Sequence, residues 1–125
     1  MLGNHDVGAT LAVSDFEASR RFYEETLGLA TELAMEGSAI YTSGSTRLLV
    51  YESQYAGTNQ ATAATWAVGG ELDAVIDELR GKGVTFEHYD DLPGTTREGD
   101  IHTIGEMRGV WFKDRDGNIL SVVDQ

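Results

Sequence analysis

A strand, a turn and a helix follow one another in Thr10-Leu-Ala-Val-Ser-Asp-Phe-Glu-Ala-Ser-Arg-Arg-Phe-Tyr-Glu-Glu-Thr-Leu-Gly28. The small and β-branched residues before Ser14 are typical of a β-strand, which we expect over residues 7–13. Ser14 and Glu17 have the spacing of a capping box, so a helix is predicted from about Asp15 to Thr26. The glycine that closes this stretch is the expected C′ residue, because glycine readily adopts the left-handed conformation that ends many helices.

The same order of elements occurs twice along the chain. The first copy continues with three expected strands, at residues 30–35, 39–42 and 46–51. The second copy has an expected strand at 61–68, a helix at 71–80, an irregular segment at 89–106, and strands at 84–88, 110–113 and 119–123. The pattern therefore predicts an α+β fold with βαβββ repeated, in one domain whose modules span about residues 5–52 and 61–125.

The composition excludes several classes of protein. The 125 residues include 21 Asp and Glu, 9 Lys and Arg and no Cys, which gives a net charge of −12. Without cysteine, the chain has no disulfide, thiolate zinc site or cysteine nucleophile. Because a nucleic-acid-binding face is basic, the acidic balance argues against a nucleic-acid partner. No stretch reads as a membrane span or a signal peptide, so we expect a cytoplasmic protein without a membrane partner.

Two motifs resemble those of the vicinal oxygen chelate superfamily, which includes glyoxalases, bleomycin-resistance proteins and extradiol dioxygenases. Within residues 13–28, the elements V-x-D, S-x-x-F-Y and L-G stand at the spacing usual in that family. Trp111-Phe-Lys-Asp-Arg-Asp-Gly-Asn118 is similar to the family's F-x-D-P-D-G-N hairpin, with Arg115 in place of proline. The resemblance implies two βαβββ modules that form a cup-shaped mixed sheet, with helices on the convex face and a ligand or metal on the concave face.

The resemblance also points to four metal-ligand positions, where enzymes of the family carry His, Glu or Gln. Aligning the motifs places Gly8, Leu49, Ala63 and Ser121 at these positions. None of these side chains is a carboxylate or an imidazole, and a one-residue shift of the alignment supplies no strong ligand. We therefore expect no metal ligands in the chain, and no divalent metal or other cofactor.

Strand alternation extends the concave face from these four positions, because side chains two residues apart point the same way. Together with the aligned Leu49 and Ser121, alternation gives Thr10, Arg47, Tyr51 and Thr65 as candidate ligand-binding residues. The resemblance adds His102 and Glu106, because residues 100–107 correspond to a segment that often lines the mouth of the cup in this family. Arg47 is either a clamp for an anionic ligand group or a strand-end arginine that reaches solvent. His102 and Glu106 are either a polar pair at the pocket rim or solvated loop residues. The aromatic candidates for stacking on a flat ligand, each with core packing as the alternative, are Tyr41, Trp66, Tyr89 and Trp111.

The sequence favours a metal-independent small-molecule-binding protein of the glyoxalase/bleomycin-resistance type that sequesters a drug-like or aromatic metabolite. The alternative is an enzyme with a non-standard site, either a glyoxalase-like lyase or isomerase or a dioxygenase-related enzyme. His102 and Glu106 are its only local acid–base pair, and no catalytic residue is assigned. A third hypothesis is an interaction module without a ligand-sized cavity. Homodimerisation through edge strands is a further prediction that the sequence leaves open.

Overall fold

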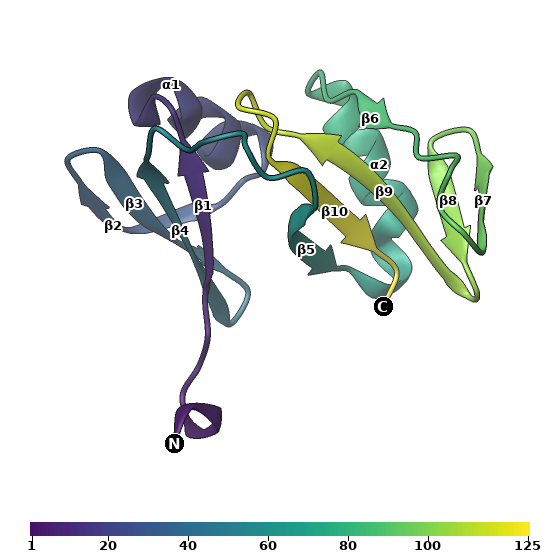
Figure 1. Ribbon diagram of the computed structural model, residues 1–125, viewed down its shortest axis with the longest axis horizontal. Helices are drawn as coiled ribbons and strands as arrows, with labels where there is room; N and C mark the ends of the chain where they lie inside the picture. Colours follow the sequence, from purple (N-terminus) through teal and green to yellow (C-terminus); the bar gives the residue numbers. More distant parts are fainter. The chain divides into compact units, whose positions relative to one another are not determined.

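The computed structural model describes all 125 residues, from Met1 to Gln125. The chain forms two compact units, of which the first comprises Met1–Gln60 with Arg115–Asn118, and the second Ala61–Asp114 with Ile119–Gln125. Each unit has its own sheet and its own α-helix (Figure 1). That the two units make one domain stays a prediction. No helix is long and apolar enough to cross a membrane.

The first unit is a mixed sheet covered by one helical tract. Its elements are η1 (Leu2–Asn4), β1 (Ala9–Val13), α1 (Phe16–Arg21), η2 (Phe22–Thr26), β2 (Ala30–Met35), β3 (Ser38–Ser43) and β4 (Thr46–Glu52). The strand order is β1-β4-β3-β2, with β1 parallel to β4 and the other pairs antiparallel. Tyr23 in η2 stacks on Tyr41 of β3 at 6.3 Å between ring centroids, and both side chains are fully buried. This contact packs the helical tract against the apolar face of the sheet.

The second unit repeats this arrangement with additional strands. Its elements are β5 (Thr62–Ala67), η3 (Gly69–Glu71), α2 (Leu72–Gly81), β6 (Phe86–Glu87), β7 (Thr95–Glu98), β8 (Ile101–Ile104), β9 (Met107–Lys113) and β10 (Ile119–Val123). The order is β5-β10-β9-β8-β7, with β6 beside β9, and β5 and β10 are the parallel pair. Helix α2 lies behind β9 and β10 in Figure 1. The buried residues of this core are Leu72, Ile76, Leu79, Phe86, Val110, Phe112, Leu120 and Val122.

The α+β class and the repeated strand–helix order are confirmed, but the irregular segment predicted at 89–106 is wrong. Strands β7 and β8 lie within it and pair antiparallel, with Arg97 opposite His102. Their sequences, TTRE and IHTI, carry little apolar alternation, because β7 is largely exposed. These strands therefore form because they pair with each other across the turn at Gly99, whose φ is +62°. They do not depend on a hydrophobic pattern in their own sequences.

The capping box predicted at Ser14 is also wrong, because Asp15 is the N-cap of α1. Its carboxylate accepts the backbone N–H of Ala18 at 3.1 Å. The backbone N–H of Phe16 donates to the Glu52 carboxylate at 3.0 Å, so β4 supplies a second acceptor to the helix start. The helical tract ends before Gly28, whose φ of +72° confirms the predicted left-handed residue.

Candidate functional site

A hollow of about 200 Å³ lies on the face of the second sheet opposite the core, and we call it the second-unit hollow. Two rows of paired residues cross its floor: Thr65–Ser121–Trp111 and Val123–Gly109–His102. The alternate residues of β9 and β10 point into the core, as strand alternation requires. The complete lining is Thr62, Thr65, His102, Ile104, Met107, Gly109, Trp111, Ser121 and Val123.

The floor of this hollow depends on a glycine at its centre. A Cβ atom at Gly109 would lie 2.9 Å from Val123 Cγ1 and 3.0 Å from the Val122 carbonyl oxygen. Both distances are shorter than ordinary van der Waals contact, so a larger residue here would require the Val123 side chain and the β10 backbone to shift.

Trp111 is the aromatic wall of the hollow and is held from several sides. Its indole N–H donates to the Thr62 hydroxyl at 3.0 Å. Its ring makes edge-to-face contacts with His102, at 4.8 Å between centroids, and with Tyr89, at 5.3 Å. A ring held by a hydrogen bond and two aromatic contacts is a preorganised surface for a flat ligand.

His102 is the only ionisable side chain in the lining, and it is 1% exposed. Its Nε2 accepts the backbone N–H of Tyr89 at 2.9 Å, while its Nδ1 is buried without a hydrogen-bond partner. Burial is the main cause that lowers the pKa of His102 below its ordinary value, and this effect outweighs that of the Asp100 backbone, which raises the pKa. The imidazole is therefore neutral at physiological pH.

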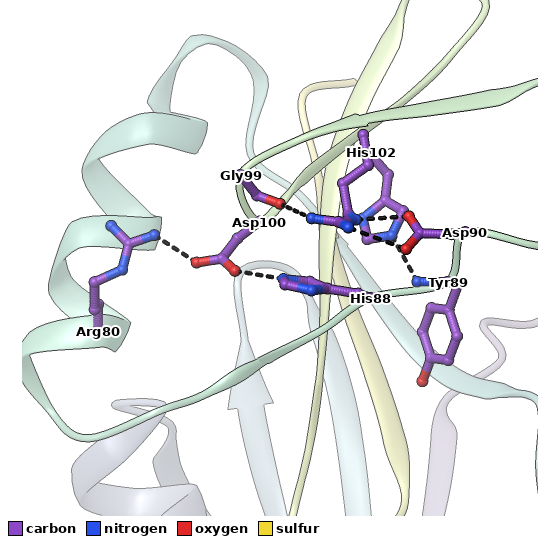
Figure 2. Close-up of polar contacts among 8 residues, drawn as sticks. Arg80, His88, Tyr89, Asp90, Gly99, Asp100 and His102 are labelled. Carbon is purple, nitrogen blue, oxygen red and sulfur yellow. Dashed lines mark hydrogen bonds and ion pairs between the residues drawn. The ribbon is translucent and has the colours of Figure 1, made fainter.

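A group of ion pairs lies beside His102 (Figure 2), and none of its residues lines the hollow. Asp100 joins the Arg80 guanidinium to the His88 ring, with both contacts at 2.8 Å. Arg97 holds the Asp90 carboxylate through two hydrogen bonds, of 2.7 and 3.0 Å. The hydrogen bond from His88, then that from Arg80, lowers the pKa of Asp100, and Arg97 lowers the pKa of Asp90. These carboxylates are thus ionised and paired with cations.

A wider hollow of about 730 Å³ lies in the first unit, and we call it the first-unit hollow. Its lining is His5, Asp6, Val7, Gly8, Ala9, Thr10, Ile40, Ser45, Thr46, Arg47 and Leu49. The Arg47 Nε lies 2.5 Å from Glu32 Oε2, and the hydrogen bond lowers the pKa of the Glu32 carboxyl. Arg47 therefore has a carboxylate partner within the protein, on a side chain that is 61% exposed.

The candidate residues divide between the two hollows. Thr10, Arg47 and Leu49 line the first-unit hollow, and Thr65, His102 and Ser121 line the second-unit hollow. Tyr51 and Glu106 line neither: Tyr51 is 39% exposed at the end of β4, and Glu106 lies in the exposed turn between β8 and β9. The alternative that His102 is a solvated loop residue is wrong, since it is a buried strand residue.

Sequence reasoning missed Thr62, Ile104, Met107 and Gly109 in the second-unit hollow. Three of them follow His102 along the chain, and strand alternation applied to residues 101–109 would have found them. Thr62 was missed for another reason. The register between β5 and β10 shifts, so that Ile119 pairs with Thr62 but Leu120 pairs with Ala64. The skipped residue, Ala63, is the one that the sequence alignment placed at a metal-ligand position.

Comparison with known proteins agrees with the motifs. The family model described as Glyoxalase/Bleomycin resistance protein/Dioxygenase superfamily matches residues 7–122. No curated protein is significantly similar in sequence.

Several solved structures share the fold. The bleomycin resistance determinant encoded on transposon Tn5 has a TM-score of 0.71 and 16% identity, over 97% of this chain and 98% of that chain. Lactoylglutathione lyase from Agrobacterium tumefaciens has a TM-score of 0.70 and 19% identity, over 95% and 92%. The genomically encoded fosfomycin resistance protein of Listeria monocytogenes has a TM-score of 0.66 and 15% identity, over 97% and 90%. The family match covers most of the sequence, and the chain therefore belongs to the glyoxalase/bleomycin resistance protein/dioxygenase superfamily.

Proposed function

We propose that this protein binds a small drug-like or aromatic molecule in the second-unit hollow, without a divalent metal. The observation that carries the proposal is the lining itself, in which the fixed ring of Trp111 stands beside apolar residues and three hydroxyl groups. Binding sites for small molecules combine largely apolar walls with a few placed polar groups. The volume of about 200 Å³ suits one ring system of a ligand rather than a whole large drug.

The donor set does not fit the divalent metal that enzymes of this superfamily hold. The positions that would supply ligands carry Gly8, Leu49, Ala63 and Ser121, which offer at most one hydroxyl oxygen. No group of three or more His, Asp or Glu side chains has an arrangement that could hold a metal ion. These residues therefore support ligand binding without a metal.

The similar structures suggest which ligands to test first. Two of them are a bleomycin resistance determinant and a fosfomycin resistance protein. At 16% and 15% identity these proteins share the fold, and they support a drug-like ligand as a class without specifying the compound.

The enzyme alternative has less support from the geometry. A lyase, isomerase or dioxygenase-related enzyme with a non-standard site needs a second titratable group that lines the hollow with His102. Glu106, the partner proposed from the sequence, does not line the hollow. The Nε2 atom of His102 is already occupied by the Tyr89 backbone N–H.

The test is a ligand screen on the metal-stripped full-length protein. A Trp66→Phe variant leaves Trp111 as the single tryptophan, so its fluorescence reports on the hollow directly. We expect an aromatic compound to quench Trp111 saturably and to raise the Tm, because a ligand that binds the folded state stabilises it. Restoring zinc, nickel, iron or manganese should change neither result. Binding that requires one of these metals, or a panel with no saturable ligand, would contradict the proposal.

Two accompanying predictions concern the oligomeric state of the protein and its location in the cell. Homodimerisation is part of the proposal and is measured by light scattering on the purified chain. A cytoplasmic location is tested by fractionating cells that produce the chain from its own gene. Neither prediction affects the choice of hollow.

A further inference from the structure

The protonation state of His102 follows from geometry. A backbone N–H is always a donor, so the His102 Nε2 that accepts the Tyr89 N–H at 2.9 Å carries no proton. A neutral imidazole with a bare Nε2 has its proton on Nδ1. That Nδ1 is buried and has no hydrogen-bond partner, and burial lowers the pKa of the ring more than the Asp100 backbone and the Asp90 carboxylate raise it.

The charges around His102 are already paired among themselves. On the segment after β6, His88 contacts Asp100, and Asp90 contacts Arg97 of β7. Asp100, which precedes β8, also pairs with Arg80 of α2. On the β9 side, His102 faces Gly109 and Trp111, which do not titrate. Asp90 and Asp100 are thus each paired with an arginine, and no carboxylate lines the hollow to compensate a charged ligand.

We propose that His102, held in the Nδ1-protonated neutral form, makes the second-unit hollow selective for an uncharged ring and couples ligand binding to pH. The inference rests on the proposed function, since it names the ligand chemistry of the same hollow. A charged ring would lose its hydration on entering the hollow, and no ionised side chain of the lining would compensate for that loss. The desolvation therefore costs free energy of binding. Protonation of His102 would place a proton on Nε2, so that two donors, Nε2–H and the Tyr89 N–H, would face each other without an acceptor. This breaks the hydrogen bond that holds the Tyr89 segment, and with it the edge contact on Trp111.

The first measurement needs no ligand. Imidazole ¹⁵N shifts of the full-length protein identify the tautomer of each of the three histidines, assigned with His5→Gln and His88→Asn variants. We expect the His102 Nδ1 to be protonated and its Nε2 bare, and the Tyr89 amide to shift with the same pKa as His102. A protonated Nε2 in the neutral protein overturns the inference.

The second measurement compares rings of the same size and different charge, namely quinoline and 1-methylquinolinium at a pH where quinoline is neutral. We expect the cation to bind at least about tenfold more weakly in the Trp66→Phe background, where Trp111 reports binding. Equal affinity for the two rings overturns the inference while leaving the proposed function intact. Failure of both rings and of indole to bind overturns the proposed function together with the ligand selectivity.

The third measurement uses indole, which keeps its charge state over the working pH range. Below the pKa of His102 its affinity should fall by about tenfold per pH unit, because only the neutral protein is competent. A His102→Gln variant retains a carbonyl acceptor for the Tyr89 N–H and does not titrate, so its affinity should not vary with pH. His88→Asn is the matched control and should keep the pH dependence. A pH dependence that persists in His102→Gln, or disappears in His88→Asn, overturns the inference.

Discussion

At the scale of single residues, the surroundings of Arg47 and His102 distinguish two candidates that the sequence proposed for ligand binding. The Arg47 side chain is 61% exposed and pairs with Glu32, and exposed ion pairs of this kind contribute little to stability. His102 is 1% exposed and accepts a backbone N–H, so its chemistry is set by the protein rather than by solvent. His102 is therefore the residue at which pH should act.

The first prediction concerns stability as a function of pH. Because the folded-state pKa of His102 is lowered, the unfolded chain binds more protons between that pKa and the ordinary histidine value of about 6.5. The free energy of unfolding should therefore rise with pH through this window and level off above it. Urea unfolding at a series of pH values measures the slope. His102→Gln should flatten it and His88→Asn should not; an unchanged slope in His102→Gln would show that another group titrates.

At the scale of elements, each helix and strand is formed by partners beyond its own sequence. The α1 start is capped by Asp15 and by Glu52 from β4, a residue 36 positions away. At position 109 of β9, a Cβ atom would meet Val123 and the Val122 carbonyl oxygen of β10 at 2.9 and 3.0 Å, so β10 favours glycine there. Strands β7 and β8 form by pairing with each other and with β9. The local sequence pattern predicts the approximate positions of these elements. Contacts with neighbouring strands and helices determine the residues at which they begin.

The second prediction distinguishes the two possible caps of α1. Asp15→Ala removes the carboxylate that accepts the Ala18 N–H and should lower the free energy of unfolding by about 1 kcal/mol. Ser14→Ala is the matched control and should have almost no effect, since Ser14 is exposed and makes no capping hydrogen bond. Chemical denaturation of both variants provides the measurement. A larger loss for Ser14→Ala would restore the capping box expected from the sequence.

At the scale of the whole molecule, the first compact unit is not continuous in sequence. It includes Arg115–Asn118, the turn between β9 and β10. The Asn118 amide donates to the Ala12 carbonyl oxygen at 2.7 Å, across 106 residues of chain. The G-N pair of the family-like hairpin motif is thus a tertiary contact as well as a turn.

The third prediction tests this long-range contact. Asn118→Ala leaves the Ala12 carbonyl without the amide donor and should lower the free energy of unfolding by about 1–2 kcal/mol. Asn4→Ala, in the exposed η1, should change stability very little. Thermal and urea unfolding of the two variants make the comparison. Equal stability of Asn118→Ala and the parent chain would mean that water replaces the amide at no cost.

The sequence by itself determined the fold class, the strand–helix order and the family, because the alternation of apolar residues, the glycine turns and the hairpin motif are local signals. It also identified three residues in each hollow, from the motif alignment, from strand alternation and, for His102, from the family resemblance. The tertiary structure alone decided which of these side chains meet. The bulge that skips Ala63, the pairing of β7 with β8 and the contact of His102 with Tyr89 depend on hydrogen bonds between distant segments. Local periodicity carries no information about such partners, and so the neutral histidine beside Trp111 is a property of the folded chain.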